Sequence, residues 1–303
     1  MTCFSIEKTF LIALLSLGIL LPHTAVRAQE AAAEKSREWQ ERDKKNEKTD
    51  APIVVELFTA TECSACIFAD RMLYDAMKRK NVIALSCHIK DLSALHQRDE
   101  KDKGDLGARS EGPMDQCVFR QWSYRSGGTN QKDVTLSIPN FVINGYDRVG
   151  ADSAGAFEQM LNTYGYAYRN KSLEVFMRWK DDDTITVHLP QSPKENAVIN
   201  ASVWIIRYKD LEVERVDSGI NKGRVLRFSN IVQDVRHIGK WHGQTRSLDI
   251  DVPKPPGGDD RGGYVVLVQE MMGEPVLAAG RLADYPVAGE KKPAAAAPAP
   301  ARN

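Results

Sequence analysis

The sequence predicts an α/β domain followed by a mainly β, sandwich-like domain, behind an N-terminal segment that is removed. Three observations lead to this prediction. A strand, helix, strand pattern occupies the first folded part, alternating apolar runs dominate after residue 169, and both chain ends have compositions that build no core. With 303 residues, 42% of them hydrophobic, the chain is long enough for two domains.

The N-terminal end has the pattern of a secretory signal peptide, residues 1–28. Lys8 supplies a positive charge, an apolar run extends from Phe10 to Leu21, and Val26 and Ala28 are the small residues of a cleavage site. The apolar run is about a dozen residues, shorter than the roughly 20 that cross a bilayer. We therefore expect a periplasmic or secreted protein with no transmembrane span after cleavage.

Low-complexity segments flank the folded part. Residues 29–50 are almost wholly charged or alanine and predict a solvated linker, and residues 287–303 predict a disordered Ala/Pro tail. The first domain is expected over 51–168 and the β-rich domain over 169–286. The 41 basic and 41 acidic residues cancel, so no net field holds a polyanion and no nucleic-acid partner is expected.

The elements of the first domain follow its apolar spacing. Residues 53–58 and 82–88 predict strands, and residues 68–80 between them have helical spacing. A charged, Gly-rich insertion over 91–130 is expected to shape the rim of a site. A further strand and a helix over 153–164 follow it. This order of elements is that of an α/β domain.

The second domain is expected to be all β because its apolar residues alternate. Trp204 and Trp241 lie in this half and are expected in its core. The polar run VRHIGKWHG is expected to form a loop around an anchored tryptophan. The strand-like runs are LEVFMRW, TITVHLP, AVINASVWIIRY, SLDIDVP and GGYVVLVQEM.

Cys63 and Cys66 form a Cys-x-x-Cys motif that follows a strand and opens a helix. This context favours thiol chemistry, because backbone N–H groups and the helix dipole stabilise a thiolate at a helix N-terminus. Cys63 is the expected nucleophile. Cys66, one turn further inward, is expected to resolve the mixed disulfide. An inert structural disulfide and half of a metal site are the alternatives.

Two further residues are expected to assist the pair. Ile138–Pro139 precedes the strand FVIN, and a cis proline beside such a motif leaves a backbone edge that pairs with a substrate peptide, so we predict the cis form. Glu56 lies in the first strand, where a buried carboxylate would accept the proton that Cys66 must lose. A surface-facing Glu56 is the alternative.

The other cysteines of the mature chain, Cys87 and Cys117, are predicted to form a second disulfide, with two buried free thiols as the alternative. His88 and His96 are candidate copper ligands together with the Cys-x-x-Cys pair, because thiolate and imidazole suit copper. A structural role for each histidine is favoured over this site. Thiol exchange itself needs no bound cofactor.

Three runs, VVELFTATECSAC, SIPNFVINGYDRVG and GRVLRFSNIVQDVRHIGKWHG, resemble a family of exported bacterial thioredoxin-like proteins, domain of unknown function 1223. The resemblance covers both folded domains. It implies a thioredoxin-like first domain, with Cys63 and Cys66 at the family's cysteine-pair positions and Pro139 at its proline before a strand. It implies no particular substrate.

The sequence departs from familiar thioredoxins around the pair. Glu62 stands where a tryptophan usually precedes the first cysteine, and Ile67 where a proline often follows the second. The negative charge of Glu62 opposes a thiolate at Cys63. Glu56 lies seven positions before Cys63, one more than the usual spacing of the buried acid in thioredoxins.

The first functional hypothesis is thiol-disulfide exchange on protein or peptide thiols and disulfides, with an unknown redox partner. One alternative is a non-catalytic envelope binding protein in which Cys63 and Cys66 form a structural disulfide. A copper-binding thioredoxin-like protein is the other. The reduction potential of the pair distinguishes the first two.

Overall fold

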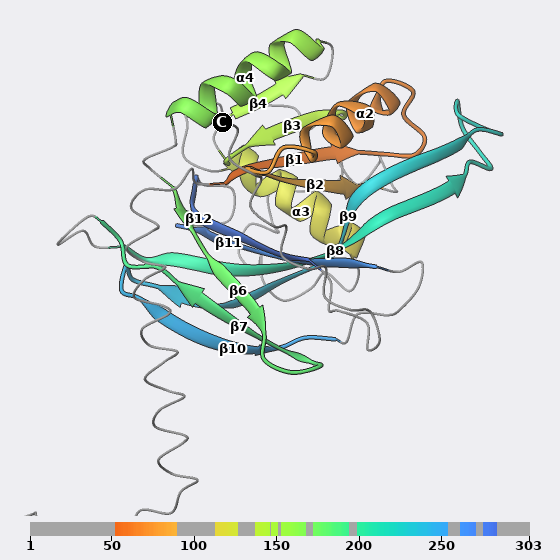
Figure 1. Ribbon diagram of the computed structural model, residues 1–303. Coiled ribbons are helices and arrows are strands. Elements are labelled where there is room, and N and C mark those ends of the chain that lie inside the picture. The colour runs from red at the N-terminus through yellow and green to blue at the C-terminus, as the bar shows by residue number, and fades with distance from the viewer. Residues whose placement is uncertain are drawn as a thin grey trace, which may run out of the picture. The chain divides into compact units, whose positions relative to one another are not determined.

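The structure, a computed structural model, describes residues 52–89, 113–126, 137–145, 147–150, 153–167, 172–193, 199–253, 261–270 and 275–283. The predicted signal peptide, linker and Ala/Pro tail lie outside these residues, as does most of the predicted insertion. All the described elements belong to one compact unit of the chain (Figure 1).

The described elements are helices and strands arranged in two sheets. The helices are α2 (Cys66–Ala76), α3 (Pro113–Ser126) and α4 (Ala154–Ala167). The strands are β1 (Ile53–Thr59), β2 (Val82–His88), β3 (Asn140–Ile143), β4 (Asp147–Gly150), β5 (Leu173–Glu174), β6 (Phe176–Trp179), β7 (Thr184–Leu189), β8 (Ala201–Arg215), β9 (Val225–Trp241), β10 (Arg246–Asp251), β11 (Gly262–Gln269) and β12 (Val276–Ala283).

Within the described residues, the strands form a nine-stranded sheet of order β4-β3-β1-β2-β9-β8-β11-β12-β5 and a three-stranded sheet of order β10-β7-β6. The fold is therefore mixed α/β and mostly β, which confirms the predicted fold class at that level. Most predicted strands and helices are present, with boundaries that differ by a few residues. Helix α2 starts at Cys66 and ends at Ala76, where the chain turns and the N–H of Arg79 donates to the carbonyl of Ala76.

Helices cover both faces of β1, which explains why all its residues are buried. Strand β1 runs parallel to β2 and antiparallel to β3. Val55 and Leu57 point to one face and pack with apolar residues of α2 and α4. Val54 and Phe58 point to the other face and pack with residues of α3, β8 and β11 (Figure 1). The two faces of β1 therefore belong to two separate cores.

The contact of β2 with β9 joins the strands of both predicted domains in one sheet. Ser86 of β2 pairs with Ile231 of β9. Beside this pair, Asn230 has a φ of +50°, a conformation that asparagine adopts more readily than most residues, and its Nδ2 donates to the carbonyl of Ala84 at 2.9 Å. The predicted division between residues 168 and 169 stays a prediction, and the sheet is continuous across it.

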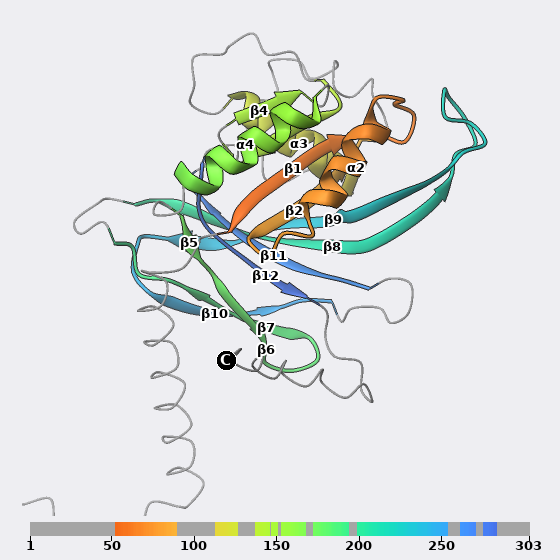
Figure 2. The same ribbon diagram turned by 45° about the horizontal axis from the view of Figure 1, so that its top comes forward.

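The three-stranded sheet packs face to face on the second half of the large sheet, as in a sandwich (Figure 2). Val187 of β7, Val203 of β8 and Val266 of β11 are buried in this interface. Trp241, 2% exposed, closes one end, and its indole N–H lies 3.2 Å from the carbonyl of Pro190. Its predicted core position is confirmed.

Two predictions for this half are wrong. The run VRHIGKWHG is not a loop, because β9 continues to Trp241 and pairs with β8 along this stretch. Trp204 is only partly buried and lies outside the core, because its ring packs edge-on against that of His237 on the neighbouring strand, 5.1 Å between centroids.

Candidate functional site

Cys63 and Cys66 stand at disulfide distance at the start of α2. Their Cα atoms are 5.2 Å apart. Cys63 lies in the turn after β1, where its N–H donates to the carbonyl of Ala60, and Cys66 is the first residue of the helix. The N–H of Cys66 donates to Sγ of Cys63 at 3.2 Å. Cys63 is partly exposed and Cys66 is fully buried, so an outside sulfur reaches Cys63 alone.

The backbone N–H groups at the start of α2 favour negative charge on Cys63, and the charge of the neighbouring Glu62 opposes it. Helix α2 has no side-chain cap at Ala65 and no acidic residue in its first turn. The backbone N–H groups there are therefore free of a competing anion within the helix. The N–H of Cys66 already points at the Cys63 sulfur, which is the interaction that stabilises a thiolate at a helix N-terminus.

A hairpin from the second half of the chain contacts the residues just before Cys63. We call residues 211–225, the outer ends of β8 and β9 with their connecting turn, the β8–β9 arm (Figure 2). Oγ1 of Thr61 donates to Glu214 at 3.2 Å, and Nδ2 of Asn221 donates to the carbonyl of Thr61 at 3.0 Å. Oγ of Ser218 donates to Glu62 at 2.6 Å. Sequence reasoning missed these contacts.

Apolar packing supports the arm against the start of α2. Val216, Leu226 and Phe228 form a small core with Ile231, and Ile67 packs against it. Ile67, which stands where thioredoxins often have proline, therefore anchors the helix to the second half of the chain. The pair is held from outside its own strand, helix, strand unit.

Pro139 lies at the same end of the sheet as the pair. Asn140 pairs with Phe58, so Pro139 lies opposite the last residue of β1. The Ile138–Pro139 peptide bond is cis, as predicted. The turn that carries Cys63 leaves β1 at this same end, so the register brings the predicted proline and the pair to one end of these neighbouring strands.

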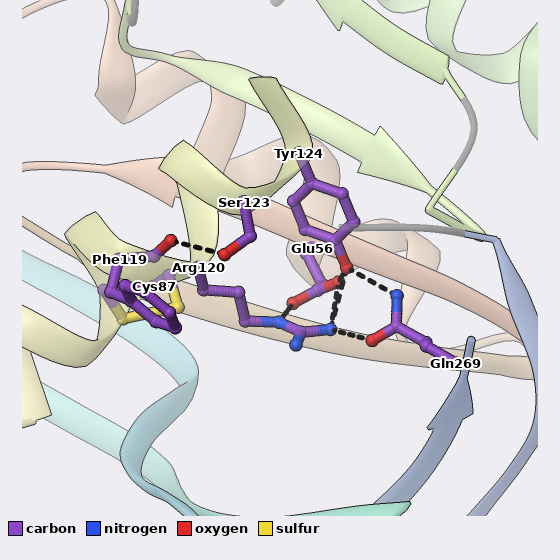
Figure 3. Close-up of polar contacts among 8 residues, drawn as sticks. Glu56, Cys87, Phe119, Arg120, Ser123, Tyr124 and Gln269 are labelled. Carbon is purple, nitrogen blue, oxygen red and sulfur yellow. Dashed lines mark hydrogen bonds and ion pairs between the residues drawn. A yellow bond between two sulfur atoms is a disulfide. The ribbon is translucent and has the colours of Figure 1, made fainter. Parts of the chain in front are cut away.

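Glu56 is buried in an ion-pair network on the face of β1 that α3 covers (Figure 3). Its carboxylate accepts hydrogen bonds from Nε and Nη2 of Arg120, the latter at 2.9 Å, and from the hydroxyl of Tyr124. Nη2 of Arg120 also donates to Gln269 of β11 at 3.1 Å. Glu56 and Arg120 have almost no exposed surface. The structure therefore places Glu56 on the sheet face opposite α2 and Cys66.

The groups in this network determine one another's protonation states. Burial alone would lower the pKa of Arg120, but the Glu56 carboxylate reverses this effect and raises it. Burial also raises the pKa of Tyr124, with the Arg120 charge opposing it and the Glu56 charge adding to it. Arg120 therefore stays charged and Tyr124 stays a neutral donor, the states in which both donate to Glu56.

Cys87 and Cys117 also stand at disulfide distance, with Cα atoms 5.3 Å apart. Both are 1% exposed, and the bond ties the end of β2 to α3 (Figure 3). It therefore fastens the helix that carries Arg120 and Tyr124. The four cysteines among the described residues therefore form the two pairs that the sequence predicted.

Asp70 is an acidic residue near the pair that sequence reasoning missed. It lies one turn after Cys66 in α2, and its Oδ2 accepts a hydrogen bond from Oγ1 of Thr59 at 3.4 Å. Burial raises its pKa to about 7, although the Thr59 hydroxyl lowers it in part. The signal in the sequence was a carboxylate at the i+4 position from Cys66, on the apolar stripe of the helix.

No group of three or more histidine, cysteine or acidic side chains that could hold a metal is found among the described residues. The ring of His88 packs against Phe228, with centroids 4.3 Å apart, and His96 lies outside the described residues. In the part of the chain that the structure covers, no helix is long and apolar enough to cross a membrane.

Comparison with known proteins gives a fold relative and a family. The crystal structure of protein AGR_C_4864 from Agrobacterium tumefaciens is similar, with a TM-score of 0.58 and 20% identity over 80% of this chain and 99% of that one. At this identity the likeness concerns the fold. No curated protein matches the sequence. The model of a family described as protein of unknown function (DUF1223) matches residues 113–269, more than half of the chain. The chain therefore belongs to the DUF1223 family.

Proposed function

We propose that this protein is an exported thiol-disulfide exchange protein whose first half is a thioredoxin-like domain. Its substrates would be protein or peptide thiols and disulfides outside the inner membrane. The observation that carries the proposal is the asymmetry of the pair. Cys63 is partly exposed at a helix start, and Cys66 is buried behind it at disulfide distance.

The exchange would proceed in two steps. The Cys63 thiolate attacks one sulfur of a substrate disulfide, forms a mixed disulfide and releases the other substrate sulfur as a thiolate. Cys66 then attacks Sγ of Cys63, which forms the Cys63–Cys66 bond and releases the second substrate sulfur. The two cysteines lose two electrons and the substrate disulfide gains them. Run backwards, the same steps oxidise a substrate dithiol.

The edge at Pro139 would receive the substrate chain. Pro139 precedes β3 at the end of the sheet where β1 leads into the pair. A proline has no N–H to pair within the protein, and a peptide in extended conformation binds at such an edge through its own main chain. The partly exposed Cys63 would then meet a cysteine of that peptide.

A second candidate is a binding protein in which Cys63–Cys66 is a structural disulfide. The arm contacts favour it, because three hydrogen bonds to Thr61 and Glu62 hold the segment just before Cys63 in place. The charge of Glu62 beside Cys63 also disfavours the thiolate that exchange requires.

The reduction potential of the pair separates these two functions. We would equilibrate the mature protein in graded glutathione buffers, trap free thiols with a mass tag and use a Cys63→Ser variant to isolate the couple. A midpoint between roughly −120 and −270 mV is expected for exchange. A pair that stays oxidised below about −300 mV would refute exchange in favour of the binding protein. N-terminal sequencing of the protein from the producing cell would test export and removal of residues 1–28.

A further inference from the structure

In the proposed exchange, Cys66 must lose a proton before it attacks. Its side chain has no exposed surface, so bulk water does not supply the base. A thiol away from water gives up its proton reluctantly, because the thiolate loses its hydration. The exchange therefore requires a protein group on the buried side of the pair. The inference below rests on the proposed function.

Asp70 lies on that side. It follows Cys66 by four residues in α2, so both side chains occupy one face of the helix with Cβ atoms about 6 Å apart. Helical side chains lean towards the N-terminus, which brings the Asp70 carboxyl towards the turn of Cys66. Its Oδ1 is buried and accepts no hydrogen bond from the described residues, whereas Oδ2 is bonded to Thr59. Oδ1 therefore has a lone pair available for a proton.

The groups around Asp70 leave it as the acceptor. From β1 it faces the Thr59 hydroxyl, and the cluster that packs against Ile67 of the same helix is apolar and includes Phe228 and Ile231 of β9. Burial raises the pKa of its carboxyl, and the Thr59 hydroxyl lowers it in part. The titratable and charged side chains on the surrounding elements include Cys66, Arg71, Tyr74 and Asp75 of α2, Glu56 of β1, His88 of β2, Arg227 of β9, and Glu62 and Glu214 at the arm contact.

Glu56 does not suit this role. It lies on the opposite face of β1, and its carboxylate is the counter-charge of the buried Arg120. Protonation of Glu56 would leave that guanidinium without its counter-charge in the core, which is strongly unfavourable. We therefore look to α2, and not to β1, for the proton acceptor.

We propose that Asp70 takes the proton of Cys66 during exchange and returns it when the disulfide opens. In the forward step, the Cys66 proton moves to Oδ1 of Asp70 as the Cys66 sulfur bonds to Sγ of Cys63, and the substrate sulfur leaves as a thiolate. In the reverse step, an incoming thiolate attacks Cys63, Cys66 leaves as a thiolate and Asp70 protonates it. A pKa of about 7 suits a group that does both near neutral pH.

The test separates the two steps by rapid mixing. Reduced protein, with Cys87–Cys117 shown by mass spectrometry to remain bonded, is mixed with an aromatic disulfide whose thiolate absorbs visible light. The first thiolate reports attack by Cys63 and the second reports attack by Cys66. Asp70→Asn should leave the first phase unchanged and slow the second by about 100-fold at neutral pH. The rate of the second phase in wild type should have an inflection near pH 7, and Asp70→Asn should lose it.

Two variants serve as controls. Asp75→Asn changes an exposed acid of the same helix, bonded to Lys78, and should leave both phases unchanged. Glu56→Gln tests the other acid. A second phase in Asp70→Asn with the rate and pH profile of wild type would overturn the proposal. A slower second phase in Glu56→Gln but not in Asp70→Asn would also overturn the proposal.

A measurement on unaltered protein keeps the proposal testable if a variant fails to fold. The carboxyl carbon of Asp70 is followed by NMR against pH in the oxidised and reduced states. Two groups that share a proton titrate together, and Cys66 carries a proton only in the reduced state. The titration curve of Asp70 should therefore differ between the oxidised and the reduced protein. Identical curves would overturn the proposal. The glutathione titration judges the exchange function separately, because it reports the potential of the pair and not the rate of the Cys66 step.

Discussion

Replacing Asp70 by asparagine should change how the stability of the folded protein depends on pH. In the fold the carboxyl has a pKa of about 7, against an ordinary value of 3.8, because burial penalises its charge. This pKa difference of about 3 corresponds to about 4 kcal/mol of unfolding free energy, because one pKa unit is worth about 1.36 kcal/mol. Between these two values the folded state binds a proton that the unfolded state does not. The unfolding free energy therefore falls as the pH rises from about 4 to about 7, and stays level above that for this group.

Urea unfolding of the oxidised protein at a series of pH values measures this effect. The unfolding free energy of wild type minus that of Asp70→Asn should fall by up to about 4 kcal/mol between pH 4 and pH 8. The difference cancels the other titrating groups, and Asp75→Asn removes an exposed acid of the same helix, so it should not show a fall caused by burial. If the Asp70→Asn difference is flat, the carboxyl is hydrated in the folded protein and our reasoning about its burial is wrong.

Three further substitutions test other parts of the structure. Glu62→Gln should speed alkylation of reduced Cys63 at neutral pH several-fold, by removing a neighbouring negative charge; an unchanged rate, followed by mass spectrometry, would contradict this. Cys87→Ala with Cys117→Ala should lower the unfolding free energy by about 3 to 4 kcal/mol, from the closed loop of 30 residues, and a loss below about 1 kcal/mol would argue against the staple. Gly280→Ala would place a Cβ 1.9 Å from the backbone oxygen of Val175, the residue between β5 and β6. We therefore expect this substitution to lower the unfolding free energy, measured by urea unfolding, by about 3 kcal/mol or more.

The strands that the sequence predicted well are those with an uninterrupted apolar signal. IVVELF and TITVHLP correspond to β1 and β7, because burial on both sides or strict alternation leaves little choice of structure. Strand β9 was missed over much of its length. It carries charged residues on its exposed side, an irregular φ at Asn230 and a glycine at Gly239 with a φ of +142°, and each of these features weakens a local strand pattern. Only its pairing with β8 and β2 makes it a strand.

The candidate site divides in the same way between local and distant information. The spacing of Cys63 and Cys66 after a strand predicted the pair, and X-Pro before a strand predicted Pro139. The environment of Glu56 was not predictable, since its partners Arg120 and Tyr124 come from α3, 64 and 68 residues further along the chain. The local sequence around a carboxylate in a first strand does not reveal whether the side chain faces a thiol or a guanidinium.

The arm contacts tie the chemistry of the pair to the second half of the chain. Thr61 and Glu62 precede Cys63 directly, yet their partners lie 153 to 160 residues further on. Ile67, just behind Cys66, packs against the apolar cluster of Val216, Leu226, Phe228 and Ile231 at the base of this arm. The second half of the chain therefore contacts the Cys-x-x-Cys motif on both sides. The position of the Cys-x-x-Cys motif therefore depends on contacts made by the β-rich half of the chain, and not only on its own strand, helix, strand unit.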